Sequence, residues 1–346
     1  MNNFLEKSKK CRDLLESLPA IIDIEEIKKN FDFTRIQIDK LNNEINETIE
    51  DWKFIKNKFS VILVGSYGRL ESSHISDLDF CIIYNDGVSS IEKKMIKETI
   101  QSLIEKNFTK KISLFLENSY SDIITNIGGK DDSSINFTTR ILILMESIPL
   151  IGDNLYHKLI SKLCKIYLEE YVREGKYPLF LTNEIIRFWR TLCIDYRWKK
   201  MEMEKPWATR NIKLRFSRKL LCFATLILSI FLFKGIISQD KFQELVTYPS
   251  SIKMLHIYGL IDKDKNFSGR SDLLKCIEKI IMQYDDFLKN IYNNKIRKNL
   301  EIVEFKKRDT NDNYVNLKEK AKEFHNNLVD LIEKIDKSIV KKYLIM

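Results

Sequence analysis

The apolar positions in the first half of the chain follow two different spacings, which predict a mixture of helices and strands. Residues 33–58 carry an apolar residue every three to four positions, which is the spacing of an amphipathic helix. Continuous apolar runs follow at residues 59–64 and 78–84, and their short length and β-branched residues indicate buried strands. The other elements expected in this half are helices at 2–17, 91–106 and 136–147 and a third strand at 111–116.

The second half of the chain has helical spacing only. Its expected helices are 156–172, 182–200, 211–237, 240–246, 270–295 and 315–343. We therefore expect an α+β protein, with a small mixed-sheet domain and its N-terminal helices at residues 1–155 and an all-α helical domain at residues 156–346. The most apolar run, Leu220–Phe233, is shorter than the ~20 residues that span a bilayer, so a buried core helix is favoured over stable membrane insertion.

The connection between the two buried strands carries the residues with the clearest chemistry. Gly65 and Ser66 end the first strand, and Asp77 and Asp79 enter the second. Alternate residues of a strand point to the same face, so the two carboxylates are expected to project side by side while Leu78 points into the core. Two such carboxylates repel each other unless a cation lies between them. Hard divalent ions prefer oxygen ligands of this kind and usually bind substrate phosphates as well.

The combination GSYGR…SDLD, which runs from Gly65 to Asp79, resembles the signature of the DNA polymerase β-like nucleotidyltransferase superfamily. It is most similar to the bacterial nucleotidyltransferases related to glutamine synthetase adenylyltransferase and PII uridylyltransferase. A second matching stretch is Thr139–Leu155, and a third, weaker match is Phe188–Leu221, so the resemblance covers roughly residues 59–221.

This resemblance implies a metal-dependent enzyme that transfers a nucleoside monophosphate from an NTP to an acceptor hydroxyl by a two-metal mechanism. The acceptor is a protein, an RNA or a small molecule. Asp77 and Asp79 are the expected ligands of Mg²⁺ or Mn²⁺, because charge develops on both sides of the transferred phosphorus. The expected phosphate-binding residues of the turn are Gly65, Ser66, Tyr67 and Arg69, with backbone amides on the β- and γ-phosphates and the arginine on the leaving group.

A third carboxylate on a later strand often helps to activate the acceptor hydroxyl in this superfamily. Glu117, at the end of the third expected strand, is the best candidate, and Asp122 is the alternative. Neither lies in a convincing DxD-like context. If neither reaches the metals, the chain is expected to be a non-catalytic nucleotide-binding sensor or a partner in a stress or phage-defence system.

Basic residues in the second half suggest a further contact with phosphate. Arg187 and Arg190 are three positions apart on one expected helix and therefore share a face. They are expected to contact the triphosphate or an anionic acceptor, and the alternative is a solvated helix face with local ion pairs. The net charge of +9, from 58 basic and 49 acidic residues, agrees with nucleotides, RNA or an acidic protein as partners, or reflects only the lysine-rich composition.

The cysteines and the N-terminus indicate the cellular compartment. The six cysteines show no CxxC spacing and most lie among apolar residues, which favours reduced core thiols over disulfides or a zinc site. The N-terminal residues lack the apolar stretch of a signal peptide. We therefore expect a cytoplasmic location.

Overall fold

The computed structural model describes residues 3–19, 22–52, 57–107, 112–170, 172, 176–202 and 206–344. The chain divides into two compact units, and each is built from segments that are distant in sequence. The sheet unit comprises Met1–Asp13, Lys29–Glu174 and Gln239–Pro249, and the helical unit comprises Leu14–Lys28, Gly175–Ser238 and Ser250–Met346. The expected domain boundary between residues 155 and 156 stays a prediction.

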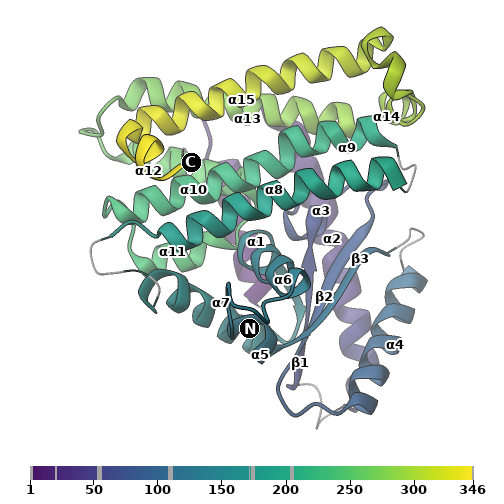
Figure 1. Ribbon diagram of the computed structural model, residues 1–346. Coiled ribbons are helices and arrows are strands. Elements are labelled where there is room, and N and C mark those ends of the chain that lie inside the picture. The colour runs from purple at the N-terminus through teal and green to yellow at the C-terminus, as the bar shows by residue number, and fades with distance from the viewer. Residues whose placement is uncertain are drawn as a thin grey trace. The chain divides into compact units, whose positions relative to one another are not determined.

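The sheet unit contains a four-stranded mixed sheet with the order β3-β2-β1-β4 (Figure 1). The central strands β1 (Phe59–Val64) and β2 (Leu78–Tyr84) are antiparallel, and they have the bounds that the two apolar runs predict. The strand β3 (Ile112–Ser119) runs parallel to β2 and extends three residues beyond the expected end at residue 116, while the expected start at residue 111 lies outside the described residues. The expected α+β class, with a small mixed sheet and a helical region, is confirmed.

The fourth strand was not expected from the sequence. β4 (Ile148–Ile151) pairs with β1 at the edge of the sheet, and it contains Pro149. Proline has no N–H to donate, so it is disfavoured in the middle of a sheet, where it would remove a hydrogen bond between strands. It is tolerated on an edge strand such as β4.

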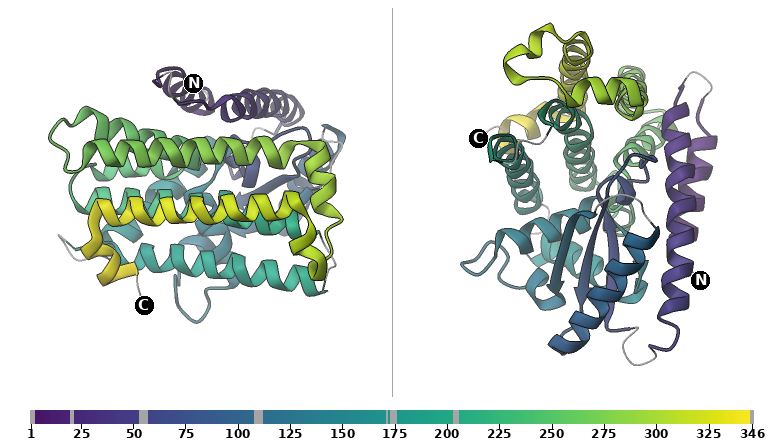
Figure 2. Two further views of the ribbon diagram at one scale, coloured as in Figure 1. Left: turned by 90° about the horizontal axis from the view of Figure 1, so that it is seen from above. Right: turned by 90° about the vertical axis from the view of Figure 1, so that its right-hand side faces the viewer.

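Helices surround the sheet, and all of them lie in its unit except for residues 14–16 of the first and 25–28 of the second. They are α1 (Asn3–Glu16), α2 (Glu25–Thr48), α3 (Gly65–Gly68), α4 (Ser90–Asn107), α5 (Tyr120–Ile124), α6 (Ser134–Met145), α7 (Asp153–Lys165) with a π-helical continuation (Ile166–Glu170), and α11 (Gln239–Val246). The helix α4 covers one face of β2 and β3 (Figure 2, right). There the ammonium of Lys93 lies 5.3 Å from the ring centre of Tyr84, and that of Lys97 lies 5.0 Å from the ring centre of Phe115.

The helical unit consists of long helices that pack along one another. They are α8 (Leu179–Glu202), α9 (Trp207–Lys213), a π-helical turn (Leu214–Arg218), α10 (Lys219–Phe233), α12 (Ser250–Lys263), α13 (Arg270–Tyr292), α14 (Asn294–Glu301), a 3₁₀ turn (Phe305–Thr310), α15 (Asp312–Ile339) and a final π-helical turn (Val340–Leu344). The left view of Figure 2 shows α13 and α15 side by side. Phe216 stacks on Phe287 with ring centres 4.6 Å apart, which places aromatic side chains at the centre of this core.

The most apolar helix is part of that core. Within the described residues, Trp207–Phe233 alone is long and apolar enough to cross a membrane by length and composition, and 72% of its apolar window is buried inside the protein. The interpretation of Leu220–Phe233 as a buried core helix is therefore confirmed.

Candidate functional site

Gly65 and Asp79 bring the glycine turn and the carboxylate pair together. Val64, the last residue of β1, pairs with Asp79 on β2, and Gly65 follows it with a φ of +66°. A Cβ atom on Gly65 would lie 2.5 Å from Oδ2 of Asp79, closer than real side chains approach. Glycine is required here both for its backbone conformation and for the space that the carboxylate occupies.

The turn after β1 is the short helix α3. Arg69 N–H donates to the carbonyl of Gly65 at 3.0 Å, and Glu71 N–H donates to that of Ser66 at 3.0 Å. The first N–H groups of any helix lack an intrahelical acceptor, so those of the Gly65 turn can serve an anion. Ser66 is half-buried, whereas the side chain of Tyr67 is 3% exposed and burial raises its pKa to about 12. Tyr67 can therefore offer its backbone but not its hydroxyl to a ligand.

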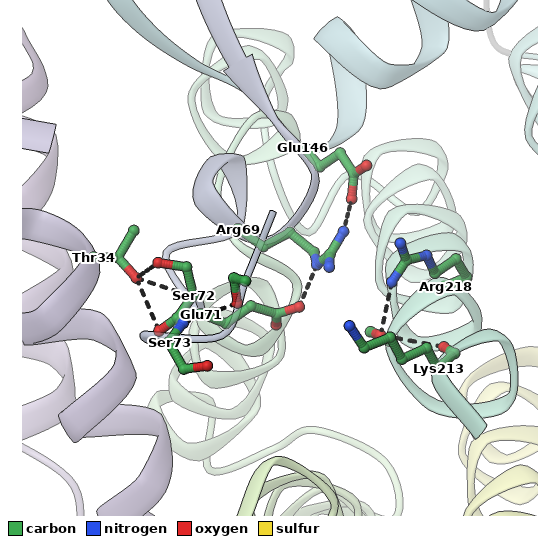
Figure 3. Close-up of polar contacts among 10 residues, drawn as sticks. Thr34, Arg69, Glu71, Ser72, Ser73, Glu146, Lys213 and Arg218 are labelled. Atoms are coloured by element: carbon green, nitrogen blue, oxygen red, sulfur yellow. Dashed lines mark hydrogen bonds and ion pairs between the residues drawn. The ribbon is translucent and has the colours of Figure 1, made fainter. Parts of the chain in front are cut away.

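Arg69 is part of a buried ion-pair triad. Its Nε pairs with Glu71 and its Nη1 with Glu146, and the three side chains are between 2% and 5% exposed (Figure 3). Both carboxylates belong to this chain, so the guanidinium is already used in fixing the loop after α3 to the end of α6. For this reason we leave Arg69 out of the proposed phosphate contacts, although the sequence predicts it there.

Hydroxyl groups fix the same loop to α2. Ser72 N–H donates to Oγ1 of Thr34 on α2 at 2.9 Å (Figure 3), and within the loop Ser73 N–H donates to Oγ of Ser76 at 3.0 Å. Hydrogen bonds therefore hold the loop that leads to Asp77 in place. Asp77 is exposed and Asp79 is half-buried, while Leu78 between them is 1% exposed, as the strand pattern predicts.

Glu117 lies on the opposite face of the sheet from Asp79. A register shift between Leu78 and Asp79 pairs Asp79 with Leu114, and Glu117 then pairs with Ile82. Paired residues of neighbouring strands point to the same face, so the side of Asp79 is occupied on β3 by Leu114, Leu116 and Asn118. Oε2 of Glu117 instead lies 3.0 Å from Nζ of Lys97 on α4. We therefore do not include Glu117 among the proposed catalytic residues.

Asp122, the alternative third carboxylate, has a local role. It accepts a hydrogen bond of 3.1 Å from Ser119 N–H and completes a capping box at the start of α5.

Glu146 is the carboxylate that sequence reasoning missed. Burial raises the pKa of Cys81, and the negative charges of Asp79 and Glu146 raise it further, so both carboxylates lie near this thiol. The side chain of Glu146 is nevertheless engaged by Arg69, 77 residues earlier in the chain. The sequence contains no local signal for this pair, because Glu146 follows an ordinary apolar helix.

Arg187 and Arg190 belong to the helical unit, on α8. Both are exposed, and Nη1 of Arg187 lies 3.3 Å from Oε1 of Glu184. Their contact with a nucleotide stays a prediction.

The carboxylate pair fits a metal that arrives with its substrate. In the part of the chain that the structure describes, no group of three or more His, Cys, Asp or Glu side chains could hold a metal ion. Mg²⁺, however, commonly binds one or two carboxylates and completes its shell with water and substrate phosphates. Asp77 and Asp79 would provide such a partial ligand set.

Comparison with known families agrees with this geometry. The family model described as a nucleotidyltransferase domain matches residues 45–131, which include β1, α3, β2 and β3 and therefore both Gly65 and Asp79. No curated protein and no solved structure matches the chain. The matched segment is similar to nucleotidyltransferase domains, a class that transfers a nucleoside monophosphate from an NTP, usually with a divalent metal.

Proposed function

We propose that this chain transfers a nucleoside monophosphate from an NTP to an acceptor hydroxyl on a protein, an RNA or a small molecule. The observation that carries the proposal is the contact between Gly65 and Asp79, because it puts a turn with available N–H groups against a carboxylate. A structural role alone does not account for this contact. An apolar side chain would fill the space beside the turn at lower cost, yet the half-buried residue there is the carboxylate Asp79.

In this proposal, Asp77 and Asp79 hold Mg²⁺ or Mn²⁺, and the Ser66 hydroxyl and the amides of Gly65 to Tyr67 bind the β- and γ-phosphates. The bound metal would neutralise charge on the phosphates during in-line displacement. Arg187 and Arg190 remain candidate contacts for the triphosphate or the acceptor. The likeness of GSYGR…SDLD to the adenylyl- and uridylyltransferases favours a protein hydroxyl. A bacterial cytoplasmic location is part of the proposal, and six free cysteines, five of them buried, suit a reducing compartment.

A second candidate is a non-catalytic nucleotide sensor or a partner in a stress or phage-defence system. It is favoured by the residues beside Asp79 on β3, which are Leu114, Leu116 and Asn118 rather than a carboxylate. The nearby Glu71 and Glu146 are paired with Arg69, so neither is available as a general base without breaking a buried ion pair.

Incubation with each α-labelled NTP and Mg²⁺ or Mn²⁺, with and without cell lysate, separates the two candidates. Metal-dependent transfer of label to protein, RNA or a small molecule is expected for the enzyme, whereas the sensor binds the NTP and transfers nothing. The matched control for the site is Asp131→Asn, because Asp131 is an exposed carboxylate outside the pair.

A further inference from the structure

The helical unit contains a cluster of basic side chains that the nucleotide site does not use. Arg215 lies in the π-helical turn Leu214–Arg218, Lys219 opens α10, and His325 lies on α15. All three are half-buried. Within the described residues, no ion pair joins any of them to a carboxylate, in contrast to cations of this unit such as Lys279, which pairs with Glu323 at 2.7 Å.

Two hydrogen bonds and one contact between aromatic rings fix the position of the cluster. Asn211 Oδ1 accepts from Arg215 Nε at 2.9 Å and from the Tyr314 hydroxyl of α15 at 3.1 Å. Further along the same helix, Phe223 meets the ring of His325 edge-on, with ring centres 6.4 Å apart. Arg215 and Lys219 therefore lie between two points at which this helix contacts α15.

The third wall of the cluster comes from α8. Nζ of Lys219 lies 5.6 Å from the ring centre of Trp189, and Tyr196 of the same helix lies near Asn211. Aromatic faces tolerate a nearby cation and can also stack on a planar ligand.

The electrostatics of the cluster are unfavourable without an added anion. Burial and, to a smaller extent, the charge of Arg215 lower the pKa of Lys219 to about 8. Burial, Lys219 and Arg215 all lower the pKa of His325, so the three groups are close enough to repel one another. His325 Nδ1 is buried and has no hydrogen-bond partner among the residues that the structure describes. A buried polar atom without a partner destabilises the fold unless a ligand or ion satisfies it.

The backbone at this place is also unusual. The π-helical turn interrupts the long helix Trp207–Phe233 and carries Arg215 and Arg218. Such turns are rare within α-helices and occur frequently at functional sites, because they redirect side chains that an α-helix would place elsewhere.

We propose that Arg215, Lys219 and His325 form an anion site that binds the phosphate group of a phosphorylated ligand. A planar guanidinium can hold two phosphate oxygens, an ammonium adds a compact charge, and an imidazole Nδ1–H donates one more hydrogen bond. Two cations and an imidazole that a bound anion would help to protonate match the double charge of a phosphate better than the single charge of a carboxylate. The site lies wholly in the helical unit and does not depend on catalysis at Asp79.

Inorganic triphosphate is the first probe, added to the full-length protein in the presence of a metal chelator so that the proposed nucleotide site is not engaged. Calorimetric titration is expected to give roughly tenfold weaker binding for Arg215→Gln and for Lys219→Gln than for wild type. The matched controls are Arg297→Gln and Lys279→Gln, which remove cations that have carboxylate partners. Without ligand, Lys219→Gln is expected to melt at or above the wild-type temperature, since the repulsion is relieved.

The imidazole signals of His325 report on the site directly. Bound triphosphate is expected to raise the pKa of His325 in an NMR titration and to leave the exposed His74 unchanged. The variant with both Asp77→Asn and Asp79→Asn is expected to bind triphosphate as wild type does in chelator. Equal affinity of Lys219→Gln and Lys279→Gln, an unmoved His325, or loss of binding in the Asp77/Asp79 variant would each overturn the proposal.

ATP and a short single-stranded RNA distinguish the sources of the phosphate. Tighter binding of ATP than of triphosphate, abolished by Arg215→Gln, identifies a nucleotide, and tighter binding of the RNA identifies a polynucleotide. Failure of all three probes to bind overturns the site.

Discussion

Gly65 and Asp79 exclude any side chain between them: a Cβ atom on Gly65 would approach Oδ2 of Asp79 to 2.5 Å. The two residues belong to different motifs, 14 positions apart in sequence, and strand pairing between Val64 and Asp79 brings them together. The phosphate-binding turn and the metal-binding carboxylate of the proposed site are therefore one structural unit.

Replacing Gly65 with alanine is expected to destabilise the protein and to impair NTP binding. Gly235→Ala is the matched control, because Gly235 has a similar φ of +69° but has no atom within 4 Å of the place that a Cβ would take. The control should cost about 1–2 kcal/mol for backbone strain alone. Gly65→Ala should cost more, and the excess should disappear when Asp79→Ala is added. Chemical denaturation of the four variants measures this, and equal costs for the two glycines would contradict the contact.

Replacing Arg69 tests whether this residue stabilises the fold or binds a ligand. Because it is buried between Glu71 and Glu146, Arg69→Met is expected to lower the free energy of unfolding by about 3–5 kcal/mol, as removal of one partner leaves buried charges uncompensated. Arg12→Met, which removes an exposed partner of Asp32, should cost at most about 1 kcal/mol. A stable Arg69→Met protein with weakened NTP binding would instead restore Arg69 to the leaving-group role.

The sequence alone could predict those features of the site that depend on residues adjacent in the chain, and not those that depend on contacts between distant segments. Both central strands, the buried Leu78 and the carboxylates at the strand entrance depend on a few adjacent residues, so their pattern is visible in the chain. The face of Glu117 depends on the register between β2 and β3, and the one-residue shift after Leu78 reverses it. The pairing of Arg69 with Glu146 depends on the path of the chain over 77 residues, and no local pattern encodes it.

Asp285 gives the helical unit a defined pH dependence. Its Oδ1 accepts from Ile27 N–H at 2.7 Å, and burial raises its pKa to about 6. An aspartate in an unfolded chain has a pKa of about 4, so the folded state holds the proton more tightly. Its contribution to stability is therefore fully present below pH ~4 and is lost as the pH rises to about 6. Asp285→Asn, which keeps the acceptor oxygen, should flatten this change in thermal melts between pH 4 and pH 7, and an unchanged slope would exclude Asp285 as its source.

Metal and nucleotide are expected to bind together. The carboxylate pair would supply only part of a metal's ligand set, so Mg²⁺ alone should shift the melting temperature little. An NTP with Mg²⁺ at a hundredfold excess over its Kd should add about 2.7 kcal/mol of stability, because it binds only the folded state. Thermal melts with each NTP, with Mg²⁺ or with chelator, provide the measurement. A shift of equal size in chelator would place the binding elsewhere than at Asp77 and Asp79.

The most direct test of the proposed function is transfer of label from an α-labelled NTP by wild type and by the variant carrying both Asp77→Asn and Asp79→Asn, with thermal melting of the same samples. In the proposed function the carboxylates serve the metal and not the core, so the variant should lose transfer and melt at or above the wild-type temperature in metal-free buffer. Asp131→Asn should retain transfer. Wild-type turnover by the double variant, or a collapsed melt, would contradict the assignment of Asp77 and Asp79 as the metal-binding centre of a nucleotidyltransferase.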